Sequence, residues 1–135
     1  DVAVTGVQTC ALPIFIILIV ARHWAAPYPW SRHYEAALAA GIDAGAAAQI
    51  ARGEEPASLA ADEKLVYRYC TTLLRSGRID EATVAGLRDT YGAAGLIDLV
   101  GLMSYYFTVS MVLAVDNHTV PEGNFPKLEP VHRID

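Results

Sequence analysis

The sequence predicts an all-α domain of about six helices that is oligomeric in its intact form. Ala and Leu, which are good helix formers, are common along the 135 residues. Apolar residues recur at the three- and four-residue spacing of a helix face. The hydrophobic fraction is 53%, which is high for a soluble monomer of this size. The excess indicates either buried subunit interfaces or a membrane segment.

The first 14 residues are expected to be foreign to the rest of the chain. Residues 4–14 read VTGVQTCALPI, which is the translation of a common sequencing-library adapter in one frame. The alternatives are an ordinary N-terminus or a signal peptide, but no basic region precedes the apolar run that follows. We therefore exclude residues 1–14, with Cys10, from the reasoning on fold. The domain is then expected to span 15–123, followed by an irregular tail over 124–135.

Two helices are predicted at the start of this domain. Residues 14–21 read IFIILIVA, which is too short to span a bilayer and is interpreted as a buried helix. Pro27 and Pro29 then break the chain. Pro29 suits the first turn of a new helix, where its missing N–H costs nothing. This second helix is predicted over residues 30–40, with Gly41 ending it.

Capping residues and glycines define the remaining helices. Asp43 and Asp80 are suited to cap helix N-termini, and Gly77 and Gly92 are suited to end helices. The predicted ranges are about 43–52, 62–77, 80–92 and 93–115, with a polar linker over 53–58.

The last helix has two possible environments. Residues 96–115 carry one charge, Asp98, and are long enough to cross a membrane. No Lys or Arg follows until Lys127, so the usual orientation signal is missing. Its small residues, such as Gly101 and Ser104, suit close helix packing in either setting. We favour an oligomer core over a membrane span, and therefore a cytoplasmic protein.

Composition argues against several other classes. The formal net charge is −5 and the ten Lys and Arg residues are dispersed, so nucleic acid is not expected as a partner. The two cysteines, Cys10 and Cys70, are too few for a disulfide framework or a zinc site. No metal-ligand constellation or phosphate loop is visible. We therefore predict neither a metal nor a cofactor.

Several short segments of the sequence resemble one known family. Residues 21–38 read ARHWAAPYPWSRHYEAAL, and DEKLVYRYCTTLL, RIDEATVAGLRDTYG and LIDLVGLMSYYFTVSMVLAVDN follow in order. In order and spacing these resemble the carboxymuconolactone decarboxylase-like (alkylhydroperoxidase D-like) family over roughly residues 15–123. The resemblance implies an all-helical fold and a homo-oligomer, a trimer or a hexamer.

The peroxidases of that family use Glu followed by C-x-x-C-x-x-x-H, and this chain departs from the pattern. The Glu position falls at Ile14, the two cysteine positions at Ala26 and Pro29, and only His33 matches. Peroxide reduction by this route needs a thiolate and a resolving thiol. Cys70 lies on an apolar helix face and is expected to be an inert buried thiol. Peroxidase activity is therefore the less favoured alternative.

The favoured hypothesis is cofactor-free acid–base chemistry, lyase-like, on a small carboxylate or lactone. His33 and His23 are the candidate acid–base residues. Arg22 would hold a substrate carboxylate, and Tyr28 and Trp30 would line the pocket. Ordinary packing and helix-end hydrogen bonds explain the same residues without a function. A catalytically degenerate oligomeric member of the family is the remaining alternative.

Overall fold

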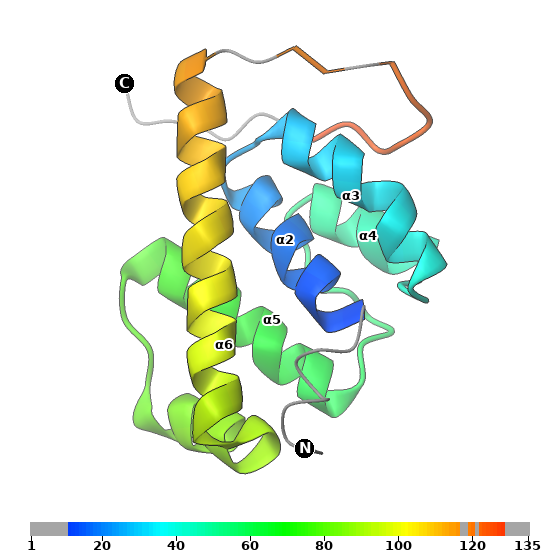
Figure 1. Cartoon of the computed structure of the whole chain (residues 1–135). Helices are drawn as coiled ribbons and strands as arrows, with labels where there is room; N and C mark the ends of the chain where they lie inside the picture. Colours follow the sequence, from blue (N-terminus) through cyan, green and yellow to red (C-terminus); the bar gives the residue numbers. More distant parts are fainter. Residues whose placement is uncertain (1–10, 117–118, 121, 129–135) are drawn as a thin grey trace.

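The computed structural model describes residues 11–116, 119–120 and 122–128 (Figure 1). These residues form helices and loops without a strand, which confirms the predicted all-α class. The helices are α2 (Ala11–His23), α3 (Pro27–Ala39), α4 (Ala44–Ala51), α5 (Ala61–Ser76) and α6 (Glu81–Asp116). Cys10, His118 and His132 lie outside the described residues.

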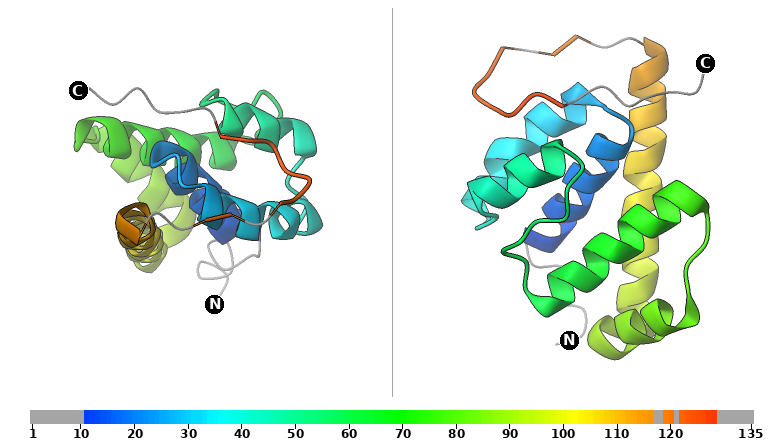
Figure 2. Two further views of the ribbon diagram at one scale, coloured as in Figure 1. Left: turned by 90° about the horizontal axis from the view of Figure 1, so that it is seen from above. Right: turned by 180° about the vertical axis from the view of Figure 1, so that it is seen from behind.

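Helix α2 is the centre of the fold. It packs against each of the other four described helices, and it lies among them in Figures 1 and 2. Every residue from Phe15 to Ala21 is buried, because a helix that is apolar on all sides must be covered on all sides. The helix begins at Ala11, three residues before the predicted start, and Leu12 also lies in the core. Residues 11–14 thus form the first turn of this helix.

Helices α3 and α4 cover one side of α2. Helix α3 begins at Pro27, three residues earlier than predicted, because Pro27 as well as Pro29 fits in a first helical turn. The chain leaves this helix through Gly41, whose φ of 97° suits glycine. The Asp43 side chain accepts a hydrogen bond of 3.0 Å from the backbone N–H of Ala46, which confirms the predicted cap of α4.

Helices α5 and α6 complete the bundle. Gly77 ends α5 in the left-handed conformation, as predicted. Asp80 accepts a hydrogen bond of 2.8 Å from the Thr83 N–H at the start of α6. Gly92 has φ 74° and ψ 172°, so it breaks the helical path, yet the chain runs on as one element with a kink there. The predicted helices over 80–92 and 93–115 are therefore the two arms of α6, which Figure 1 shows turning away from each other.

The second arm of α6 lies at the edge of the molecule. Seen end-on in the left view of Figure 2, it stands outside the other helices. By length and composition α6 could cross a membrane: its most apolar 18-residue window has a mean hydropathy of 1.7, and 17% of that window is buried. One face carries Leu99, Met103 and Ser110 into the core, and the other face is exposed.

Candidate functional site

The structure distributes the five predicted site residues over three separate cavities. Arg22 and His23 line one between α2, α4 and α5. Tyr28 and His33 line a second between α3 and α6. Trp30 borders a third beside residues 120 and 122–128. The single cleft predicted for these residues is therefore not formed, because the chain turns sharply between α2 and α3.

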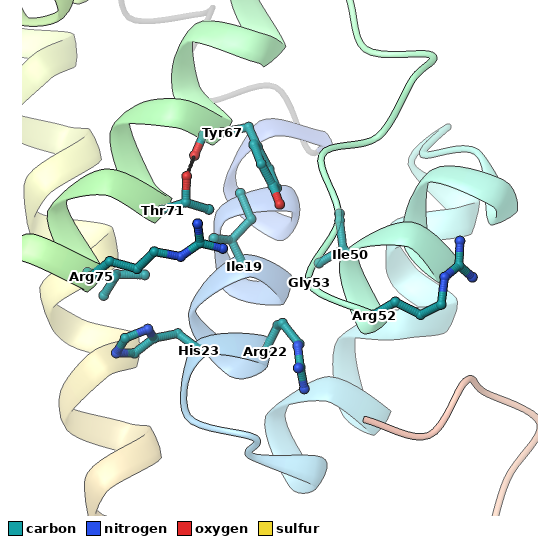
Figure 3. A pocket seen from close by; sticks show the side chains of 10 residues that line it. Ile19, Arg22, His23, Ile50, Arg52, Gly53, Tyr67, Thr71 and Arg75 are labelled. Atoms are coloured by element: carbon teal, nitrogen blue, oxygen red, sulfur yellow. Dashed lines mark hydrogen bonds between the residues drawn. The ribbon is translucent and has the colours of Figure 1, made fainter. Parts of the chain in front are cut away.

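We call the first cavity the arginine cavity (Figure 3). Its volume of about 690 Å³ is in the range of small-molecule sites. Its lining combines apolar side chains with cationic and hydroxyl groups. The lining residues are Ile19, Arg22, His23, Ile50, Arg52, Gly53, Tyr67, Thr71, Leu74 and Arg75.

The charge of the arginine cavity is positive. Among the described residues that line it there is no Asp or Glu. Arg75 and Tyr67 extend from α5 toward the side of the cavity that carries Arg22 and His23 (Figure 3). Arg52 points away from these side chains and pairs with Glu54 at 2.8 Å on the exposed surface. The cavity therefore suits a small molecule with a carboxylate or a similar anionic group.

Local structure positions Arg22 and Arg75, the two arginines of the cavity other than Arg52. Arg22 lies in the last turn of α2, where a cation is favoured by the helix dipole. A Cβ at Gly53 would lie 3.5 Å from Arg22 Nε, so the guanidinium rests against the backbone of this glycine. On α5, Tyr67 and Arg75 lie eight residues apart on one helix face. Thr71 lies between them and donates a hydrogen bond of 2.8 Å to the Tyr67 carbonyl oxygen.

His23 is the titratable group of the arginine cavity. Burial lowers the pKa of its imidazole below the ordinary value, and the positive charge of Arg75 lowers it further. Its ring stacks on Phe107 of α6, with ring centroids 6.3 Å apart. The imidazole is therefore held in place and neutral near pH 7, which makes it a proton acceptor.

His33 occupies a different and smaller cavity of about 250 Å³. Its Nδ1 lies 2.8 Å from the Pro29 carbonyl oxygen, which can only accept, so Nδ1 carries the proton. The other ring nitrogen, Nε2, lies 3.5 Å from the Tyr106 hydroxyl. Burial raises the pKa of Tyr106, and Tyr105 raises it further. Besides His33, Arg32 is the only basic residue in the described lining of this cavity.

Trp30 and Cys70 are parts of the core. Trp30 is completely buried, and its indole N–H has no hydrogen-bond partner among the described residues. Cys70 is completely buried too, and burial raises the pKa of its thiol to about 12. At neutral pH this thiol is protonated and out of reach of a peroxide.

The sequence analysis missed the contribution of α5. Tyr67 and Arg75 occupy positions i and i+8 of a stripe that also contains Thr71. That spacing is visible in the sequence and marks one side of a helix. No local signal, however, indicates that this side faces the end of α2.

Comparison with known proteins identifies no relative of this chain. No family model, no curated protein and no solved structure matches the chain. In the described part of the chain, no group of three or more His, Cys, Asp or Glu residues could hold a metal ion. The resemblance to the carboxymuconolactone decarboxylase-like family therefore stays a prediction.

Proposed function

We propose that the protein binds a small organic carboxylate in the arginine cavity and carries out cofactor-free acid–base chemistry on it. The observation that supports this is the pairing of Arg22 and Arg75 with a neutral His23 in one cavity of small-molecule size. Planar guanidinium groups bind carboxylates through paired hydrogen bonds. Ile19 and Leu74 would contact the apolar body of the molecule.

The reaction that this arrangement suits is decarboxylation. When the substrate carboxylate enters, its negative charge raises the pKa of His23 and favours the imidazolium form. As carbon dioxide leaves, the electron pair of the broken C–C bond stays on the remaining carbon. The imidazolium donates its proton to that carbon, and the neutral imidazole then takes a proton from water. The net change is the replacement of one carboxylate by one hydrogen.

The proposal uses one of the two predicted acid–base residues. His23 and not His33 moves the proton, because His23 shares a cavity with the arginines and His33 does not. Arg22 keeps its predicted role as a ligand of the carboxylate. Tyr28 and Trp30 contribute to other cavities and take no part in this reaction.

The test is a turnover and binding screen with small acids. A carboxylated γ-lactone is offered as substrate and the release of carbon dioxide is measured for the wild-type protein and for His23→Gln. Benzoate and benzamide serve as binding probes, because they differ only in the anionic group. We expect benzoate to bind and benzamide not to bind, and turnover to be lost in His23→Gln but kept in His33→Gln.

Two results would count against the proposal. Equal binding of benzoate and benzamide would show that the arginine cavity does not select an anion. Turnover of an organic hydroperoxide that is abolished by a thiol-alkylating reagent would favour the peroxidase alternative, in spite of the buried Cys70.

A further inference from the structure

The hydroxyl group of Tyr91 is buried without a hydrogen bond. Tyr91 lies on α6 directly before Gly92, where the helix is kinked, and the residue is 4% exposed. Its hydroxyl has no hydrogen-bond partner in the described part of the chain. Burying a hydroxyl in this way is unfavourable, because the group has lost its contact with water and gained nothing in return.

Tyr91 lines a cavity of about 440 Å³ whose charged groups are all acidic. Asp43 at the start of α4, and Asp62 and Glu63 in the first turn of α5, line the same cavity. The described lining contains no Lys, Arg or His. We call this the acidic cavity. Figure 1 shows α2 and α5 beginning at the same end of the bundle, which is the end that bears it.

The carboxylates of α5 lie near the Tyr91 hydroxyl but do not bond to it. Burial, together with the negative charges of Asp62 and Glu63, raises the pKa of Tyr91 to about 12. Both carboxylates are therefore close enough to act on the phenol, yet neither is within hydrogen-bond distance of it. An ammonium group has three donors, so it can bond to the phenol oxygen and to a carboxylate at once.

The carboxylates keep free capacity for such a group. Asp43 Oδ2 accepts a hydrogen bond of 3.0 Å from the Ala46 N–H, and Glu63 Oε2 accepts one of 2.8 Å from the Ala60 N–H. The second oxygen of each, and both oxygens of Asp62, have no hydrogen bond among the described residues. The starts of α2, α4 and α5 together contribute about 1.5 positive charges, which is less than three carboxylates supply.

We propose that the acidic cavity binds a small organic amine in its protonated form. Its ammonium group lies among Asp62, Glu63 and Tyr91, and its apolar body packs against Phe15 and Leu59. The volume of the cavity is in the range of small-molecule sites and leaves room for an aromatic ring. The amine completes the hydrogen bonding of the buried phenol and offsets the negative charge around it.

This site is separate from the arginine cavity and does not depend on the proposed function. The two cavities share no lining residue. Phe15 borders the acidic cavity, and His23 borders the arginine cavity about 12 Å further along the axis of α2. Their charges are opposite, so they select different ligands.

A metal ion fits the acidic cavity less well than an organic cation. In the part of the chain that the structure describes, no group of three or more His, Cys, Asp or Glu could hold a metal ion. Calcium and magnesium need several oxygen ligands within about 2.6 Å of one point. An ammonium group needs only two or three acceptors at about 2.9 Å, and its apolar body uses the remaining lining.

The experiment titrates the full chain with benzylamine and with benzyl alcohol. Benzylamine is an ammonium ion at neutral pH, and benzyl alcohol has a similar shape without the charge. Backbone amide resonances are followed by NMR, which reports both the affinity and the place of binding. We expect benzylamine to shift the amides at the starts of α4 and α5 in a saturable way, and benzyl alcohol to leave them in place.

Four variants test the contacts, with thermal unfolding to check that each one is folded. Tyr91→Phe removes only the hydroxyl and should weaken benzylamine binding about tenfold. Tyr69→Phe is its matched control, because that hydroxyl is also buried without a partner among the described residues but does not line the cavity. Asp62→Asn should weaken binding about fivefold, since Asp62 is exposed and screened by solvent. Asp98→Asn, on an exposed residue outside the cavity, should leave the affinity unchanged.

Four results would overturn the proposal. The first is the absence of a saturable shift with benzylamine, and the second is equal binding of benzylamine and benzyl alcohol. The third is an equal effect of Tyr91→Phe and Tyr69→Phe on the affinity, which would separate the orphan hydroxyl from the ligand. The fourth is calcium chloride that shifts the same amides and displaces benzylamine, which would indicate a metal site.

Discussion

Replacing Arg75 by Gln tests the arginine cavity through two independent readouts. Hydrogen bonds to charged groups contribute about 1.5–3 kcal/mol. Arg75 is exposed, so solvent screening reduces its contribution to about 1 kcal/mol, which is roughly a fivefold weaker binding of benzoate. Arg22 is half-buried, and Arg22→Gln should cost about 2 kcal/mol, or roughly a 30-fold loss.

The second readout does not depend on a ligand. Because the charge of Arg75 lowers the pKa of His23, Arg75→Gln should raise that pKa toward its ordinary value. Both quantities follow from one NMR experiment, in which the imidazole resonances are recorded against pH and against benzoate. Arg52→Gln is the matched control, because Arg52 borders the same cavity but points away and pairs with Glu54. Equal losses of affinity in all three variants would refute the reasoning, since they would indicate binding to net charge alone.

The remaining predictions concern stability. Ala25 has φ 46°, a left-handed conformation that costs an L-residue about 1–2 kcal/mol. Glycine avoids this cost but gives the unfolded chain more entropy, so Ala25→Gly should raise the free energy of unfolding, measured in urea, by about 0.5 kcal/mol. A decrease would contradict this. Leu18 is completely buried, whereas Leu38 is 36% exposed. Leu18→Ala should therefore lower the free energy of unfolding by about 2–5 kcal/mol, and Leu38→Ala should lower it by less than about 1 kcal/mol. Similar losses in the two variants would contradict the position of the core. Because the pKa of His23 is lowered in the folded protein, the unfolded chain binds a proton at this residue more readily than the folded chain does. The free energy of unfolding should therefore fall as the pH decreases through the ordinary value of 6.5. In His23→Gln it should fall less steeply over that range.

The parts of the fold that depend only on residues close together in the sequence could be predicted from it. Asp43 caps α4 through a side-chain oxygen three residues from its donor, and Gly77 ends α5 through its own backbone conformation. Both signals act within one helical turn. The start of α3 was placed three residues late because Pro27 and Pro29 are both allowed in a first turn, and the sequence does not distinguish them.

The candidate site depends on tertiary packing, and the sequence predicted only half of it. Arg22 and His23 were identified as a pair because they are adjacent in the chain. Arg75 and Tyr67 reach the same cavity only because α5 packs across α2. His33 and His23 were predicted to serve one site, but the turn between α2 and α3 places their side chains in different cavities.

The binding of a carboxylate beside His23 can be measured most directly by an NMR titration of the histidine rings. Without ligand, His23 should titrate below its ordinary pKa because of burial and Arg75. With saturating benzoate its pKa should rise, while benzamide should leave it in place. A His23 pKa that does not respond to benzoate, or a benzoate response at His33 alone, would contradict the assignment of the arginine cavity as the site.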